Sequence, residues 1–69
     1  MNQMIPGTIV KILPTKEFGT IIRHCKISDI KILYKGERDS LYYGHYMVMT
    51  DSGTHHVHQS QLELVWPLD

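Results

Sequence analysis

Apolar and polar side chains alternate along most of this chain with a period of two rather than the 3.6 of a helix. Such alternation is typical of β-strands with one face buried and the other in water. β-Branched and aromatic residues are concentrated in the same segments, as strands favour. The pattern therefore predicts an all-β protein with strands at residues 8–13, 20–25, 42–49, 54–58 and 64–66.

Glycine and proline mark the ends of these segments. Asp51-Ser52-Gly53 predicts a hairpin turn, because glycine readily adopts the positive φ that such turns use. Gly44 interrupts a segment that otherwise reads as a strand, which predicts a bulge or a sharp bend. Residues 60–63 are too few for an α-helix but suit one 3₁₀ turn with Leu62 pointing inward, and Pro67 ends the last strand.

Residues 26–40 allow two interpretations. Four apolar side chains between Ile27 and Leu33 are too many for a fully solvated loop. Residues 29–34 are compatible with a strand, which the polar residues 35–40 would turn back into the strand at 42–49. A short helix over residues 28–33 is the alternative, and periodicity does not separate the two over so few residues.

Five or six short antiparallel strands, with a 3₁₀ turn before the last, predict a small closed β-barrel, because closure removes exposed sheet edges. The succession Gly-x-Ile-Val-x-Ile, Gly-Thr-Ile-Ile, Tyr-x-Val-x-x-x-x-Gly and x-Val-x-x-x-x-Leu-Glu-x-Val resembles the SH3-like barrel. The resemblance is closest to KOW and Tudor-like domains and to a small photosystem I accessory subunit, and it spans Pro6 to Val65. It implies a fold that hosts many unrelated functions.

Length and charge narrow the class of protein. Sixty-nine residues make a single domain over residues 1–69, with its core at about 6–66, and a domain this small is stabilised only marginally by its own core. A homo-oligomer would add stability. Seven basic and seven acidic side chains cancel, which does not fit a strong non-specific binder of nucleic acid.

Compartment and catalysis are also constrained. The chain has no apolar run near the roughly 20 residues of a membrane span, no signal-peptide pattern and a single cysteine, Cys25, so we expect a soluble cytoplasmic protein. His24 and Cys25 are neighbours on a strand and point to opposite faces, so they do not form a nucleophile–base pair. Nucleophile-elbow and phosphate-loop patterns are missing too, and we expect no enzymatic activity and no cofactor.

Three histidines follow the predicted hairpin turn. Val57 fits a buried position, so His56 and His58 share the outer face about 7 Å apart, with His55 beside them in sequence. Such spacing permits a shared metal, or a metal-linked dimer, with His24 or His45 as a further ligand. Surface histidines near a turn are common, however, and these three are weak candidates, so we expect no dedicated metal site.

Aromatic side chains are the first candidates for partner binding. Four tyrosines lie in or near the strand at 42–49, and exposed aromatics anchor many interfaces. One or two of them could instead pack in the core. We expect a non-catalytic binding module, an accessory or regulatory protein that docks on a protein partner through Tyr34, Tyr42, Tyr43, Tyr46 and Phe18.

Basic side chains support the alternative function. All seven lysines and arginines lie within the first 38 residues, which makes this half of the chain positive. A nucleic-acid or nucleotide binder would use these charges together with the tyrosines, and a ligand could lie between copies of a homo-oligomer. The candidate phosphate contacts are Lys11, Arg23, Lys26 and Arg38.

Overall fold

The computed structural model describes residues 4–68 and shows an all-β chain. Its five strands form one antiparallel sheet in the order β4-β3-β2-β1-β5. The strands are β1 (Ile9–Ile12), β2 (Glu17–Lys26), β3 (Leu41–Thr50), β4 (Gly53–His58) and β5 (Leu62–Trp66), and two 3₁₀ turns, η1 (Ile27–Asp29) and η2 (Gln59–Gln61), connect some of them. The all-β class and the antiparallel strands are therefore confirmed, including the 3₁₀ turn before the last strand.

The sheet is open, and the prediction of a closed barrel is wrong. Strands β4 and β5 lie at opposite edges of the sheet, and no pairing joins them within residues 4–68. The chain passes from one edge to the other through η2, which follows β4 directly and leads into β5. Leu62, the first residue of β5, is buried after this connection and helps to cover the core. The connection brings no hydrogen bonds between β4 and β5, so the sheet does not close into a barrel.

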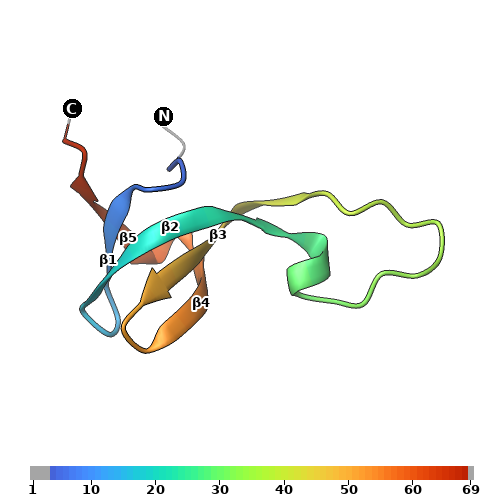
Figure 1. Ribbon diagram of the computed structural model, residues 1–69, viewed down its shortest axis with the longest axis horizontal. Helices are drawn as coiled ribbons and strands as arrows, with labels where there is room; N and C mark the ends of the chain where they lie inside the picture. Colours follow the sequence, from blue (N-terminus) through green and yellow to red (C-terminus); the bar gives the residue numbers. More distant parts are fainter. Residues whose placement is uncertain (1–3, 69) are drawn as a thin grey trace.

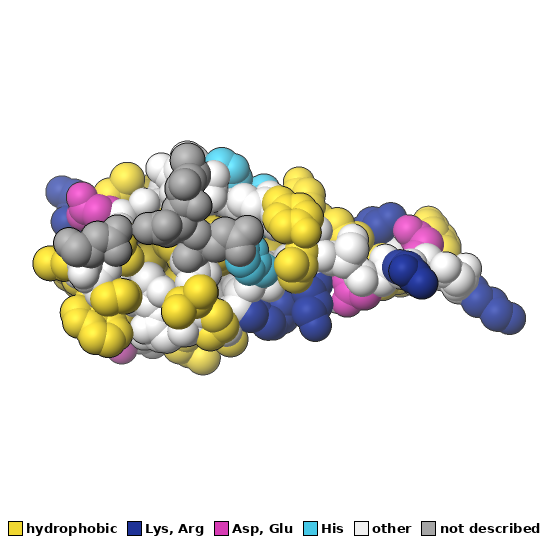
Figure 2. All heavy atoms as spheres, turned by 90° about the horizontal axis from the view of Figure 1, so that it is seen from above, with side chains coloured by type: hydrophobic (Ala, Val, Ile, Leu, Met, Phe, Trp, Pro, Cys, Tyr) yellow, Lys and Arg dark blue, Asp and Glu magenta, His cyan; other side chains and the backbone are white. Residues whose placement is uncertain are grey.

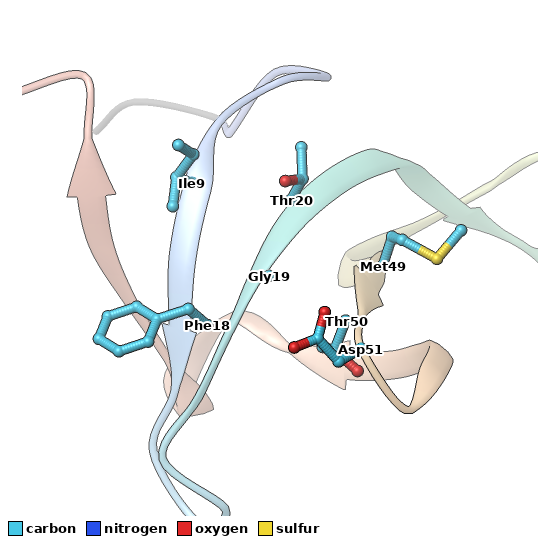
Figure 3. Close-up of a pocket in the computed structure, with 7 residues that line it drawn as sticks. All are labelled: Ile9, Phe18, Gly19, Thr20, Met49, Thr50 and Asp51. Carbon is cyan, nitrogen blue, oxygen red and sulfur yellow. The ribbon is translucent and has the colours of Figure 1, made fainter.

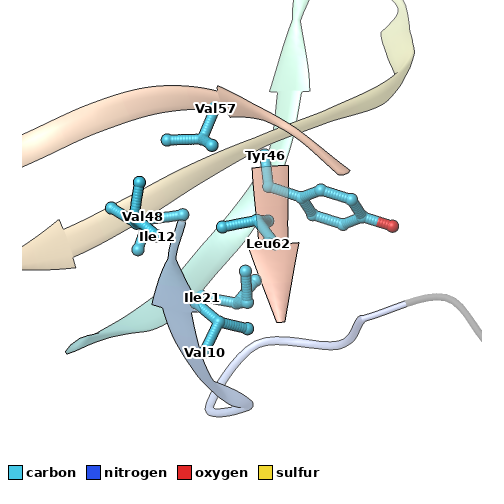
Figure 4. Packing of buried hydrophobic residues seen from close by; sticks show 7 residues of the cluster. All are labelled: Val10, Ile12, Ile21, Tyr46, Val48, Val57 and Leu62. Atoms are coloured by element: carbon cyan, nitrogen blue, oxygen red, sulfur yellow. The ribbon is translucent and has the colours of Figure 1, made fainter. Parts of the chain in front are cut away.

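The core lies on one face of the curved sheet, which we call the inner face. Seven buried side chains from all five strands meet there, as Figure 4 shows: Val10, Ile12, Ile21, Tyr46, Val48, Val57 and Leu62. The burial of Val57 and Leu62 confirms the predicted alternation in the last third of the chain. Ile21, Val10 and Val48 are almost fully buried, so they carry much of the hydrophobic stabilisation.

Local predictions at glycines hold. Thr50 pairs with Gly53, so the hairpin turn is Asp51-Ser52, and Gly53 has a φ of +115°. Gly44 has a φ of +84° within β3, where the register against β2 shifts between His24 and Lys26. This is the bulge that the sequence predicts. It lets β3 bend away from the body of the sheet.

Residues 27–40 form a projecting arm between β2 and β3 (Figure 1). The predicted strand at 29–34 is wrong, and the alternative helix at 28–33 is present only as the single 3₁₀ turn η1, one residue earlier. None of the arm residues is buried, and Ile32 is 88% exposed. Because its apolar side chains have no layer to pack on, the arm takes its shape from polar contacts at its base and tip.

Candidate binding face

The outer face of the sheet carries an uninterrupted row of side chains across four strands. The register places Ile9 opposite both Trp66 and Thr20, and Thr20 opposite Met49. Trp66 is 59% exposed and Met49 is 49% exposed, and Ile9 is also open to solvent. Three of the four side chains in this row are apolar, and exposed apolar side chains that gather together indicate an interaction site more often than isolated ones do.

A shallow hollow of about 300 Å³ lies beside this row (Figure 3). Phe18 borders it on the side of β1, and Met49 borders it on the side of β3, with β2 running between them. Its lining residues are Ile9, Phe18, Gly19, Thr20, Met49, Thr50 and Asp51. We call the exposed apolar side chains of the row and the hollow the outer apolar face: Ile9, Phe18, Met49 and Trp66.

Gly19 allows β2 and β3 to approach closely at this hollow. A Cβ atom at Gly19 would lie 2.6 Å from Cγ1 of Val48 and 2.7 Å from the carbonyl oxygen of Met49. Real Cβ atoms do not come so close, because a core packed at crystal density has no free space there. Gly19 is therefore a position where the packing of Val48 and the backbone of Met49 leaves no space for a side chain.

Phe18 is the one aromatic residue that lines this hollow, and it is 60% exposed. Its partner in the register is Lys11, whose Nζ lies 5.9 Å from the centre of the phenyl ring. A cation at that distance from an aromatic face is attracted by the ring quadrupole. The ring is thus partly held in place while most of its surface stays open to a partner.

The four tyrosines do not form one patch with Phe18. Tyr46 is only 2% exposed and packs in the core, which is the alternative that the sequence left open for one or two of them. The bulge at Gly44 puts Tyr42 against His45, with ring centres 4.2 Å apart. Tyr43 and Tyr34 are 73% and 77% exposed, but Tyr34 belongs to the arm.

The basic candidates are also dispersed. Arg23 is held by Asp29, with its two terminal nitrogens 2.6 and 2.9 Å from the carboxylate oxygens. This contact, together with the backbone N–H of Lys26, keeps the pKa of Asp29 far below its usual range. Lys11 lies beside Phe18, and Arg38 lies in the arm. Arg23 and Lys26 therefore lie together near Asp29, and the carboxylate of Asp29 already engages Arg23.

His45, His56 and His58 lie close together on the outer face of β3 and β4. Two of them, His56 and His58, are among the metal candidates that the sequence named, and the third of those candidates was His55. His45 pairs with His58 in the register, and Nδ1 of His45 lies 2.8 Å from Nε2 of His56. Burial, followed by the nearby His56 and His58, lowers the pKa of His45 below its usual value. The sequence offered His45 only as an alternative to His24, and the hairpin register selects His45 because counting back from the turn at Asp51-Ser52 puts residue 45 opposite residue 58.

His55 and His24 lie apart from these three. Nε2 of His55 is 2.9 Å from Oγ of Ser52, which also donates to Glu17 Oε2 at 2.9 Å. The carboxylate contacts the serine rather than the imidazole, so these three side chains do not have the order of a catalytic triad. His24 lies against the buried Tyr46, with ring centres 4.6 Å apart.

Cys25 is fully buried and its thiol donates a weak hydrogen bond to the carbonyl oxygen of Lys26. Burial raises the pKa of this thiol, so the protonated form dominates at neutral pH. A buried, protonated thiol is a poor nucleophile.

Across residues 4–68, helices long and apolar enough to cross a bilayer are lacking.

No protein-family model, curated protein or solved structure matches this chain.

Proposed function

We propose that this protein is a non-catalytic binding module with an open, SH3-like arrangement of strands, and that it docks on a protein partner through the outer apolar face. Two features support the SH3-like relation: the strand order β4-β3-β2-β1-β5 and the 3₁₀ turn η2 before the last strand. Docking, rather than catalysis, is the function that the exposed side chains favour.

The observation that carries the proposal is the row from Trp66 to Met49, apolar except at Thr20, with the hollow beside Phe18. At about 300 Å³ the hollow is at the lower limit of small-molecule sites, and it is open rather than enclosed. A site of this kind suits one protruding apolar side chain of another protein. Large exposed aromatics such as Phe18 and Trp66 are the residue types that dominate protein interfaces.

Charge favours a protein over a nucleic acid as the partner. The arm residues 27–40 carry three basic side chains and three acidic ones: Lys31, Lys35 and Arg38 against Asp29, Glu37 and Asp39. Figure 2 shows both kinds intermixed along the arm. A surface that contacts several phosphates needs a clear excess of positive charge, because the release of counterions dominates that affinity.

The test compares Phe18→Ser with Tyr34→Ser, two exposed aromatics in different regions. Tagged wild-type protein and both variants are used for quantitative capture from the source cells after nuclease treatment. The proposal expects one protein to be enriched by the wild type and by Tyr34→Ser, and to be lost with Phe18→Ser. Equal enrichment by all three would overturn it.

A salt titration addresses the competing function. Binding of single- and double-stranded oligonucleotides is measured by fluorescence anisotropy between about 50 and 200 mM salt, where contacts to 6–10 phosphates would lose about 10³–10⁵ in affinity. The proposal expects no binding of physiological strength. Tight, steeply salt-dependent binding that is reduced by Arg38→Ala would favour a nucleic-acid binder instead.

A further inference from the structure

The histidines of β3 and β4 form a compact group on the surface. The hairpin register places His45 opposite His58, and His56 is one pair further along the same face. The ring centre of His45 lies 4.8 Å from those of both His56 and His58, and Tyr42 stacks on its other side. We call His45, His56 and His58 the histidine cluster.

The fold accounts for His58, which caps η2, but no such structural role accounts for the contact between His45 and His56. His56 and His58 are exposed, and within residues 4–68 none of the three imidazoles forms an ion pair with a carboxylate. Protonation of neighbouring imidazoles would place like charges together, which is unfavourable. Neutral imidazoles are, however, the commonest metal ligands in proteins.

We propose that His45 and His56 chelate a first-row transition-metal ion of the copper(II) class, through Nδ1 of His45 and Nε2 of His56. A hydrogen bond joins these two atoms, which lie 2.8 Å apart. Two metal–nitrogen bonds of about 2.0 Å at a right angle, as in a tetragonal copper(II) site, bring their nitrogens to about 2.8 Å. The two nitrogens therefore already lie at a chelating separation, and a rotation of the rings must turn both lone pairs toward one metal ion.

Besides the rotation of the rings, metal binding moves one proton and leaves the number of protons unchanged. One imidazole donates its N–H in the hydrogen bond between the two rings, and that proton must move to the other nitrogen of the same ring. Both facing nitrogens then present lone pairs to the metal. The nitrogens that take no part, Nε2 of His45 and Nδ1 of His56, can carry the protons, so both rings stay neutral.

His58 is not ready to act as a third ligand. Its Nδ1 accepts hydrogen bonds from the backbone N–H and Oγ of Ser60, at 3.1 and 2.8 Å, which cap η2. In the neutral ring the proton then lies on Nε2, which blocks that atom as a ligand. In agreement, no group of three or more ligand side chains is set to hold a metal ion among residues 4–68. Two imidazoles with water in the remaining positions are what the site offers.

The test uses copper(II) alone as the probe, with isothermal titration calorimetry and electron paramagnetic resonance on the full chain. His56→Gln removes one ligand, and His55→Gln is the matched control because His55 is the next residue in β4 and points to the inner side. Circular dichroism shows whether each variant keeps the strands. Neither residue belongs to the buried core, so both variants should fold.

We expect one copper(II) ion per wild-type chain, with hyperfine structure from two imidazole nitrogens. His56→Gln should weaken copper(II) binding by at least about tenfold, because it removes one of the two imidazole ligands. His55→Gln should leave the affinity unchanged. No binding by the wild type, equal loss in both variants, or full affinity in His56→Gln would overturn the proposal.

Discussion

The sheet and the arm are two regions of one small chain that are stabilised by different forces. The sheet buries seven apolar side chains on its inner face, whereas residues 27–40 bury none. The arm relies on hydrogen-bonded carboxylates instead: Asp29 with Arg23 and Lys26, and Asp39 with Ser28. The sheet should therefore respond mainly to changes in packing and the arm mainly to changes in charge.

Shortening a buried side chain of the sheet tests whether packing stabilises it. This change should have the largest effect on the free energy of unfolding. Ile21 is 1% exposed, and Ile21→Ala should reduce the free energy of unfolding by about 2–5 kcal/mol, through lost burial and the cavity left behind. Urea denaturation followed by circular dichroism measures this change. Ile32→Ala in the arm is the control, and a loss of similar size there would contradict the division into two regions.

Overpacking at the hollow should have the next largest effect. Gly19→Ala forces a methyl group against Val48 and the backbone of Met49, and it should lower the free energy of unfolding by about 1–3 kcal/mol. Thermal unfolding monitors the loss, with Thr20→Ala on the neighbouring exposed position as the control. An unchanged melting temperature for Gly19→Ala would show that β2 and β3 can separate without cost.

Removal of the charge at the base of the arm should loosen the arm and leave the sheet intact. Asp29→Asn removes the negative charge that Arg23 contacts. It also weakens the hydrogen bond that the backbone N–H of Lys26 donates to this side chain. Hydrogen exchange at the Lys26 amide should become faster, while amides in the centre of β2 keep their protection. Uniformly faster exchange in both places would show that the arm supports the sheet.

Acid should reproduce that effect in the wild type. The pKa of Asp29 is lower in the folded chain than its ordinary value of 3.8, so its contacts add stability above that value. This stability is lost as the pH falls below 3.8 towards the folded pKa, because the unfolded chain takes up the proton first. The pH dependence of Lys26 amide exchange should show the loss, and Asp29→Asn should abolish this dependence.

The ion pair near the tip of the arm should contribute least. Lys31 Nζ lies 3.0 Å from Glu37 Oε2, and both groups are in contact with solvent. Lys31→Gln should leave the urea midpoint unchanged, because exposed ion pairs add little. A measurable shift that disappears in high salt would show that this pair matters more than its exposure indicates.

The strands could be predicted from the sequence because alternation is a local property. The burial of Val57 and Leu62, the bulge at Gly44 and the 3₁₀ turn before β5 all follow from residues within a few positions of each other. Whether the two outer strands meet is a long-range property that alternation does not encode. For that reason the predicted closed barrel was wrong while its strands were correct.

The outer apolar face was missed for a related reason. Ile21 and Ile22 are adjacent and similar, yet Ile21 is in the core and Ile22 is exposed. Where both faces of a strand carry apolar residues, apolar and polar positions no longer alternate. The sequence then does not show which face is buried. The row from Trp66 through Ile9 to Met49 appears only when the register across four strands is known. Phe18 was the one member that the sequence named as a candidate.

The arm gives this small protein a long reach. The radius of gyration is 12.7 Å, whereas a compact domain of this length has one of about 11 Å, and the longest dimension is 41 Å. Ile32 and Tyr34 lie exposed on this arm, so the arm extends the surface of the protein without adding to its core.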